Sequence, residues 1–384
     1  MWRHVASNAL TLFIVILALV AGIVAWGKKQ YAAPGPLEQA ICLRVERGSN
    51  MNRVSEQLAG MGAVRSPAIL RIGASYSGKS GQLKAGSFLV PAGASMAEIV
   101  DIVTRGGAST CGTEVVFRIG VNSTRLQLRE LDPVRNRFVE VAAFDPLAEE
   151  APQSYREARA EADTRYRLSM AEGTTVWQVV RALEAADFLS GEIAAMPPEG
   201  MLAPDSYEVT AGSDRGALLA RMEETQARRL AEAWQERAEG LPLESPEQAL
   251  ILASIIEKET ATPEERPLVA SVFVNRLKRG MRLQTDPTVI YGVTGGRGNL
   301  GRGLRQSELR RETPYNTYVI EGLPPTPIAN PGIASIRAAV NPADTAYLFF
   351  VADGSGGHVF AETLAEHNAN VARWRAIEAG RGGN

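Results

Sequence analysis

One stretch near the start of the chain, Val5 to Gly27, constrains its fold most because no residue in it is charged. Its centre, from Leu10 to Trp26, is almost entirely Leu, Ile, Val, Ala and Phe. A helix needs roughly 20 apolar residues to cross a bilayer core, so this stretch is long enough. Trp2 and Trp26 flank it at positions that suit the membrane interface. The stretch predicts a membrane-spanning helix.

A cleavable signal peptide is the competing interpretation of this stretch. Its apolar core is long for a signal peptide, and no small-x-small site follows it before Lys28 and Lys29. We therefore expect a single retained anchor. Arg3 and the amino terminus on one side are balanced by the two lysines on the other, so the positive-inside rule leaves the orientation open.

Composition excludes several classes of protein. A chain of 384 residues is expected to form two or three domains. The formal net charge of -2 gives no electrostatic footprint for nucleic acid. Three histidines and two cysteines argue against a His/Cys metal site, and we expect no metal and no cofactor. Cys42 and Cys111 could form a disulfide in an oxidising compartment or remain two free thiols.

The predicted elements divide the chain into a tail and anchor, a first module, an insertion or linker, a second module and a C-terminal domain: residues 1–30, 38–108, 109–164, 165–242 and 243–384. The first module is predicted as strand, helix, helix, strand, helix, and the second repeats much of this pattern. Both resemble lysin motifs, which often bind glycans, with a packing scaffold as the alternative. The polar insertion is expected to be partly mobile and helical near 152–162.

Two glutamates end an apolar helix predicted within residues 250–261. At about 100° per residue, Glu257 and Glu259 point roughly 200° apart, so one pocket can hold only one of them well. Glu259 continues the apolar stripe of Leu252 and Ile255, and burial there would raise its pKa toward that of a general acid. Ordinary helix-end charges are the alternative for both residues.

Two further segments near this helix carry local signals. Thr262-Pro-Glu-Glu265 predicts a capping box at the start of the next helix. Gly296-Arg-Gly-Asn-Leu-Gly301 matches a dinucleotide-binding pattern, but the Arg-rich segment that follows has no apolar helix face. We therefore reject a dinucleotide site and predict a flexible loop near the active cleft.

The chemistry of this chain rests on carboxylate, amide and aromatic groups. Its sequence contains no G-x-S-x-G motif and no Cys/His nucleophile pair. Aromatic faces, amide hydrogen bonds and one acidic carboxyl suit the binding and cleavage of glycans.

Several long motifs occur in order along the chain, and they are Gly200-Met-Leu-Ala-Pro-Asp-Ser-Tyr207, Ala253-Ser-Ile-Ile-Glu-Lys-Glu-Thr260, Val272-Phe-Val-Asn-Arg-Leu277, Met281-Arg-Leu-Gln-Thr-Asp-Pro-Thr-Val-Ile-Tyr-Gly292, Tyr315-Asn-Thr-Tyr318, Gly322-Leu-Pro-Pro325 and Phe350-Val-Ala-Asp353. Together they resemble the endolytic murein transglycosylase family, the YceG-like (MltG-type) proteins. The resemblance runs from about Ile41 to Arg373 and leaves out the insertion.

The resemblance implies an α+β protein with a transmembrane helix, lysin-motif-like modules and a mixed α+β catalytic domain. Such a lyase cuts nascent peptidoglycan strands internally and terminates their elongation. A single Glu protonates the oxygen between N-acetylmuramic acid (MurNAc) and N-acetylglucosamine (GlcNAc), then helps remove the proton of the muramic C6 hydroxyl. The product is a 1,6-anhydro sugar. The implied location is the inner membrane, with a periplasmic body and peptidoglycan synthases as candidate partners.

Other transglycosylases carry their acid in a Glu-Ser pair, which Glu259-Thr260 resembles more than Glu257-Lys258 does. The helix-face argument agrees, so Glu259 is the predicted catalytic residue and Glu257 the alternative. Asp286 is the carboxylate that would make the enzyme a two-carboxylate hydrolase, although Asp-Pro more often marks a turn or a helix start.

Polar residues downstream are predicted to position the substrate: Tyr315, Asn316, Tyr318, Gln284 and Asn275. Each could be structural instead, because buried Tyr and Asn residues are usually hydrogen-bonded. His358 is a further candidate for lining the cleft, with a surface position on a hairpin as the alternative. A glycan-binding scaffold without activity is the main competing function.

Overall fold

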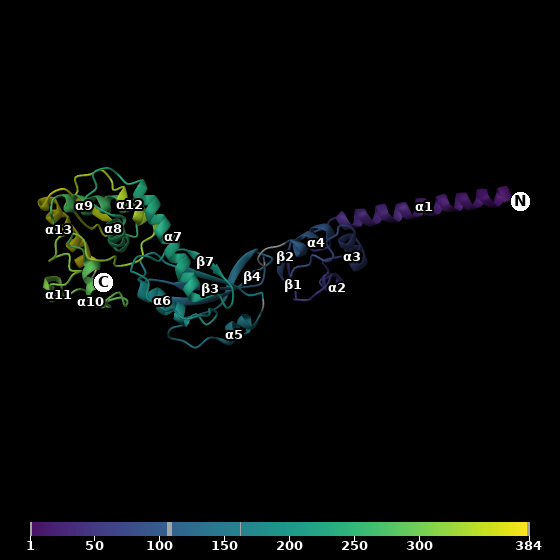
Figure 1. Cartoon of the computed structure of the whole chain (residues 1–384), viewed down its shortest axis with the longest axis horizontal. Helices are drawn as coiled ribbons and strands as arrows, with labels where there is room; N and C mark the ends of the chain where they lie inside the picture. The colour runs from purple at the N-terminus through teal and green to yellow at the C-terminus, as the bar shows by residue number, and fades with distance from the viewer. Residues whose placement is uncertain (1, 106–109, 162, 382–384) are drawn as a thin grey trace. The chain divides into compact units, whose positions relative to one another are not determined.

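The computed structural model describes residues 2–105, 110–161 and 163–381 (Figure 1). The chain divides into two compact units. The first contains Met1–Val115, Gln127–Ala143 and Pro152–Arg165, and the second contains Val116–Leu126, Phe144–Ala151 and Tyr166–Asn384. The chain therefore passes between the units several times within the segment predicted as an insertion.

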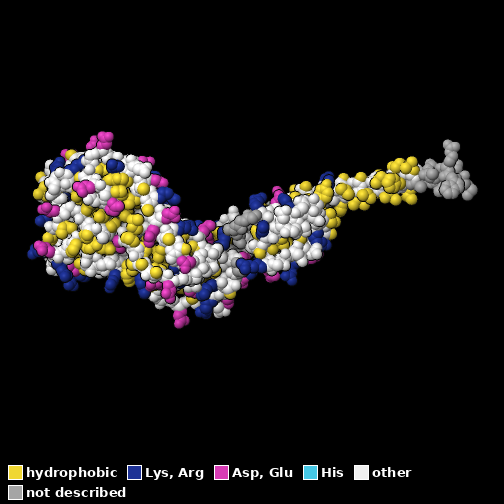
Figure 2. Space-filling model, in the orientation of Figure 1, with side chains coloured by type: hydrophobic (Ala, Val, Ile, Leu, Met, Phe, Trp, Pro, Cys, Tyr) yellow, Lys and Arg dark blue, Asp and Glu magenta, His cyan; other side chains and the backbone are white. Residues whose placement is uncertain are grey.

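The predicted apolar helix is present as α1 (Trp2–Ala32). Its segment Leu10–Ala32 has a mean hydropathy of 2.6 and is not buried. Figure 2 shows hydrophobic side chains around the described part of this helix. Within the described residues, α1 is the one helix long and apolar enough to cross a membrane.

The first module has the predicted order of elements: β1 (Ile41–Val45), α2 (Met51–Gly60), α3 (Pro67–Tyr76), β2 (Gly86–Val90) and α4 (Met96–Thr104). β1 pairs antiparallel with β2, which places Leu43 opposite Phe88, and both side chains are buried. α4 begins at a capping box formed by Ser95 and Glu98. The helix caps and the buried apolar residues thus favour the same arrangement of strands and helices in this module.

Cys42 and Cys111 form a disulfide, with Cα atoms 5.8 Å apart. The bond joins β1 to a residue 69 positions later. We expect the Cys42→Ser/Cys111→Ser double variant to be less stable by about 4 kcal/mol, because the unfolded chain is no longer cross-linked. Thermal unfolding of the oxidised and reduced wild type and the variant would measure this loss. Equal melting temperatures for oxidised wild type and variant would contradict it.

Much of the segment predicted as a partly mobile insertion forms β-strands, which the sequence analysis did not predict. Its strands are β3 (Thr113–Ile119), β4 (Thr124–Asp132) and β5 (Arg137–Phe144), in a sheet with the order β5-β4-β3-β6-β7. In β4, Thr124, Leu126 and Leu128 are buried while the polar residues Arg125 and Gln127 lie between them, a period-two pattern. The helix predicted near 152–162 is confirmed as α5 (Gln153–Ala160).

The second module contributes the remaining strands of this sheet and two helices: β6 (Arg165–Met170), α6 (Val176–Ala185), β7 (Ser206–Val209) and α7 (Arg215–Gln235). β6 and β7 pair antiparallel, with Leu168 opposite Tyr207. Both of these side chains are buried.

The C-terminal region is mainly helical: α8 (Pro246–Glu259), the 3-10 helix η1 (Pro263–Glu265), α9 (Arg266–Lys278), α10 (Asp286–Thr294), α11 (Gln306–Arg310), α12 (Ile333–Val340), the hairpin β8 (Phe349–Ala352) and β9 (His358–Ala361), and α13 (Leu364–Arg381). α8 contacts α7, α9, α10 and α12 (Figure 1). Every residue of α8 from Ala249 to Ile256 is buried. A helix buried on all sides is held rigidly by its neighbours.

Candidate active site

Helix α8 determines where the two candidate glutamates lie. Its N-cap is Ser245, whose hydroxyl accepts a hydrogen bond from the N–H of Gln248. The last turn carries Glu257, Lys258 and Glu259, whose side chains project about 100° apart around the axis. Because they point in different directions, these three side chains reach three different surroundings.

Glu257 is held by the start of helix α12. Its Oε2 accepts hydrogen bonds from the N–H of Gly332 at 3.0 Å and the hydroxyl of Ser335 at 2.7 Å. Gly332 is the N-cap of α12, where unpaired N–H groups and the helix dipole favour a carboxylate. Arg266 Nη2 lies 4.0 Å from the other oxygen of Glu257. These contacts explain Glu257 as a structural link between α8 and α12.

Glu259 lines a pocket of about 470 Å³. The side chain is partly exposed to this pocket, while protein atoms surround it closely. Burial raises the pKa of its carboxyl above the ordinary value, although a hydrogen bond from Thr285 opposes that effect. A carboxyl that keeps its proton at a higher pH can serve as a general acid.

Thr285, whose side chain contacts Glu259, is held in place by two other buried threonines. The hydroxyl of Thr285 donates a hydrogen bond to Oε1 of Glu259. The N–H of Thr285 donates to Oγ1 of Thr317 at 3.0 Å, and Thr288 Oγ1 donates to the carbonyl of Thr285 at 2.8 Å. The preceding residue, Gln284, has a φ of 51°, which is strained for a residue other than glycine. The backbone of Thr285 is therefore fixed through both its N–H and its carbonyl group.

Arg276 provides a buried cation in the same pocket. Its Nε donates to the carbonyl of Leu348 at 2.6 Å and its Nη1 to the carbonyl of Leu283 at 2.7 Å. The guanidinium lies 5.3 Å from the centre of the Phe349 ring. Burial lowers the pKa of Arg276, and the Glu259 carboxylate opposes this effect. The positive charge therefore stabilises the ionised form of Glu259.

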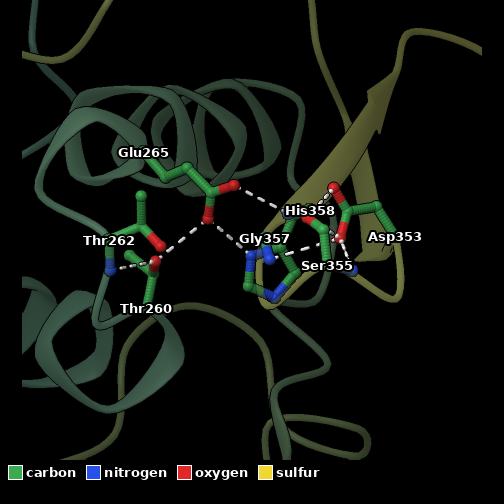
Figure 3. A network of polar contacts seen from close by, with 7 residues as sticks. All are labelled: Thr260, Thr262, Glu265, Asp353, Ser355, Gly357 and His358. Atoms are coloured by element: carbon green, nitrogen blue, oxygen red, sulfur yellow. Dashed lines mark hydrogen bonds and ion pairs between the residues drawn. The ribbon is translucent and has the colours of Figure 1, made fainter.

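The predicted capping box at Thr262 is absent, because Glu265 binds elsewhere. Thr262 makes no side-chain cap. Oε1 of Glu265 accepts the N–H of His358 at 2.7 Å, and Oε2 lies 2.7 Å from His358 Nδ1 (Figure 3). Oε2 also accepts the hydroxyl of Thr260 at 3.0 Å. Burial acts to raise the pKa of Glu265, but hydrogen bonds from His358 and Thr260 lower it overall. His358 thus joins the β8–β9 hairpin to the corner after α8.

The turn of that hairpin is itself ordered by a side chain. Oδ1 of Asp353 accepts the N–H groups of Ser355 at 2.7 Å and Gly357 at 3.2 Å (Figure 3). These bonds fix the turn that presents His358 to Glu265. β8 and β9 pair antiparallel, so His358 lies on a hairpin, as the alternative for this residue had it.

Some of the predicted substrate residues lie in the pocket of Glu259. Gln284 and Tyr318 line it together with Asp286. The hydroxyl of Tyr318 donates to Oδ1 of Asp286 at 2.7 Å. Burial raises the pKa of Tyr318, so its hydroxyl stays neutral. This side of the pocket thus presents hydrogen-bonding groups beside the carboxyl of Glu259.

Other predicted residues lie outside this pocket and have structural partners. Asn316 is fully buried, and its amide donates to the carbonyl of Arg311 at 2.7 Å. The amide of Asn275 donates to the carbonyl of Thr345 at 2.8 Å. Tyr315 packs against the hydrophobic core of the C-terminal region. Their contacts account for these three residues without a ligand.

Sequence reasoning missed several residues that line the pocket or contact Glu259. Arg276 and Thr285 stand inside the motifs quoted above, but neither was singled out. His367 also lines the pocket and stacks on Phe349, with ring centres 5.1 Å apart. An Arg among the apolar residues of a buried helix was the signal that could have identified Arg276. Among the described residues, no group of His, Cys, Asp and Glu could hold a metal ion.

A model of the YceG-like family matches residues 43–373. The chain belongs to the YceG-like family. This YceG-like chain is 47% identical over 119 residues to the endolytic murein transglycosylase of Bacillus subtilis, covering 31% of the chain and 32% of that protein. It is 37% identical over 129 residues to the endolytic murein transglycosylase of Streptococcus pneumoniae, covering 32% of the chain and 23% of that protein. The aligned part is thus a third or less of each relative's length.

A solved structure of a putative YceG-like protein from Listeria monocytogenes is also similar. It is 24% identical, with a TM-score of 0.46, and the alignment covers 86% of this YceG-like chain and 99% of the other.

Proposed function

We propose that this chain is a membrane-anchored lytic transglycosylase that cleaves the MurNAc–GlcNAc bond inside nascent peptidoglycan strands and so terminates their elongation. The observation that carries the proposal is the carboxyl of Glu259, whose pKa burial raises in a pocket lined with polar and aromatic side chains. The names of the two relatives support the substrate class. The lysin-motif-like first module is proposed to bind glycan, with synthases as partners.

In the proposed reaction, Glu259 acts first as an acid and then as a base. Its proton passes to the glycosidic oxygen as the bond from that oxygen to muramic C1 breaks. The muramic C6 oxygen then bonds to C1, and its proton returns to the Glu259 carboxylate. Thr285 orients the carboxyl, and the charge of Arg276 stabilises the carboxylate between the two steps. No water is consumed, and the product carries a 1,6-anhydro-MurNAc end.

A muramidase that uses two carboxylates is the second candidate, because Asp286 lines the same pocket. Asp286 accepts the hydroxyl of Tyr318 and begins helix α10. Those contacts give it a structural role, which favours the single-carboxylate mechanism. In a scaffold without activity, by contrast, a buried carboxyl at Glu259 would have a cost and no use.

Mass spectrometry of purified peptidoglycan incubated with the full chain tests the proposal. We expect fragments with 1,6-anhydro-MurNAc ends from the interior of the strands. Reducing MurNAc ends would indicate hydrolysis and favour Asp286 as a second catalytic carboxylate. Binding to peptidoglycan without any new ends would favour the scaffold.

We propose that α1 is a single inner-membrane anchor and that the rest of the chain lies in the periplasm. The Cys42–Cys111 disulfide supports this orientation, since structural disulfides persist in oxidising compartments. Labelling of an added cysteine in intact cells by a membrane-impermeant reagent would test it. A cysteine beyond residue 40 that reacts only after lysis would contradict the orientation.

The hydroxyl of Thr285 is expected to tune the pH dependence of cleavage. It donates to Glu259 and stabilises the charged form, so Thr285→Val should raise the pKa of Glu259. The basic limb of kcat against pH should therefore move to higher pH, and kcat at the optimum should fall about tenfold as orientation is lost. Thr285→Ser keeps the donor and serves as the control. A lower kcat with an unmoved basic limb would show that Thr285 acts only through packing.

A further inference from the structure

A second pocket, of about 150 Å³, shares two helices with the pocket of Glu259. Helix α10 contributes Asp286 to the first pocket and Ile290 and Tyr291 to the second. Helix α8 contributes Glu259 to the first and its neighbour Lys258 to the second. The second pocket has room for several water molecules or for one small polar group.

Lys258 gives this pocket a positive charge that the described residues do not pair. Its Nζ lies 3.3 Å from the carbonyl of Gly173, and no described carboxylate forms an ion pair with it. An ammonium has three donors, so at least one more partner can be bound. Burial lowers the pKa of Lys258, and the charge of Glu257 opposes that effect. A desolvated ammonium that forms no ion pair within the described residues favours the binding of an anion.

The walls of the pocket are neutral and offer further donors. None of its lining residues is acidic. The amide nitrogen of Gln178 donates to the carbonyl of Val121 at 2.7 Å, and that of Asn299 donates to Asn122 Oδ1 at 2.8 Å. Each amide nitrogen has a second hydrogen to give. The carboxylate of Glu199 accepts the Tyr291 hydroxyl at 3.1 Å from outside the lining.

The glycine-rich loop that resembles a dinucleotide motif forms part of this wall. Gly296, Gly298 and Asn299 all line the pocket. The hydroxyl of Thr175 donates to the carbonyl of Gly296 at 2.6 Å, which fixes the loop against helix α6. Gly296 and Gly298 have φ values of 72° and 128°, so side chains would strain both positions. The loop is a built wall rather than a free segment.

We propose that this second pocket binds a carboxylate of the substrate strand, carried by a muramic acid unit on its peptide stem or its lactyl group. The assignment rests on the proposed function, because the strand must also reach Glu259. Lys258 would pair with the carboxylate, while the second hydrogens of Gln178 and Asn299 would complete its hydrogen bonds. A muramic acid unit would thereby be placed relative to the bond that is cut.

The test combines a change in the substrate with a change in the protein. The dissociation constant of full-length Glu259→Gln protein in detergent is measured for peptidoglycan strands whose carboxylates are free. It is measured again for the same strands with these carboxylates converted to amides. We expect amidation to weaken binding by about 10- to 100-fold, the effect of a lost charge-assisted hydrogen bond. With Lys258→Met added, amidation should change the dissociation constant less than about twofold. The matched control is Lys278→Met, which removes an exposed lysine from the last turn of α9 and should keep the full sensitivity.

An equal sensitivity to amidation with and without Lys258 would overturn the proposal, because a purely structural lysine weakens binding of both substrates alike. If Lys258→Met fails to fold, Asn299→Asp provides the second variant, since it places a negative charge at an exposed position of the rim. It should weaken binding of the free-carboxylate strands more than that of the amidated strands, and the opposite order would also overturn the proposal.

The source of the carboxylate follows from strands whose peptide stems have been removed by an amidase, which hydrolyses the amide to the stem and leaves the lactyl carboxylate free. Sensitivity to amidation that persists on these strands assigns the lactyl group, and sensitivity that disappears assigns the stem. Production of anhydro ends by the wild-type chain is measured separately. A failure of carboxylate binding is thus distinguishable from a failure of the proposed reaction.

Discussion

Glu259→Gln is expected to lower kcat for the formation of 1,6-anhydro ends by about 10³-fold or more. The amide has nearly the shape of the carboxyl and can still accept the hydrogen bond of Thr285, but it has no proton to give to the glycosidic oxygen. Binding of peptidoglycan should change little, because the pocket is intact. Product ends counted by mass spectrometry over time, beside a binding measurement, would check both expectations.

Glu257→Gln is the matched control for this loss. The same change two residues earlier affects the N-terminus of α12, where Glu257 binds Gly332 and Ser335. It should lower stability by about 1 kcal/mol and leave most of the activity. A loss of activity from Glu257→Gln as large as that from Glu259→Gln would contradict the assignment of the acid.

The same Glu259→Gln variant should be more stable than the wild type at pH 8. Burial raises the pKa of Glu259 in the folded chain, so its contribution to stability is complete below the unfolded pKa of about 4.3. That contribution is lost as the pH rises through the folded pKa, because the charged form is then buried. A neutral amide avoids this loss, and we expect a gain of about 1 kcal/mol at pH 8 that disappears near pH 4. Melting temperatures across this range would measure it.

Much of the fold follows from local sequence signals. The anchor helix, the order of elements in the first module and the apolar helix that ends at Glu257 and Glu259 were all predicted from the sequence. The sheet strands β3 to β5 were not. The alternation in β4 is short, and the partners that bury its Leu126 and Leu128 lie elsewhere in the chain. Such pairing is a tertiary effect that a local pattern does not report.

The site, too, was predictable only where it depends on local structure. Helix geometry alone separates Glu257 from Glu259, because α8 is one rigid element. The partners of Asn316 and Asn275 are carbonyl groups of loops, whose positions depend on how those loops fold. The capping box at Thr262 was predicted wrongly because His358, 93 positions after Glu265, competes for the same carboxylate.

Arg276→Met is expected to destabilise the C-terminal region by about 3 kcal/mol and to lower the melting temperature by roughly 6 to 12 °C. Removal of the guanidinium leaves the buried carbonyls of Leu348 and Leu283 without their donors, and Phe349 loses the cation beneath its ring. These contacts connect α9 to the residue before β8 and to the loop before Thr285. Thermal unfolding followed by near-ultraviolet circular dichroism would measure the loss of packing.

Arg276→Lys separates the charge from the geometry of the guanidinium. Lysine keeps the positive charge, but it lacks the planar fork that reaches the carbonyls of Leu348 and Leu283 together. Stability should therefore remain low in Arg276→Lys, whereas the pKa of Glu259 should stay closer to that of the wild type than in Arg276→Met. The basic limb of the pH profile of kcat reports this pKa. A lysine variant as stable as the wild type would mean that charge, and not the pair of hydrogen bonds, holds this wall of the pocket together.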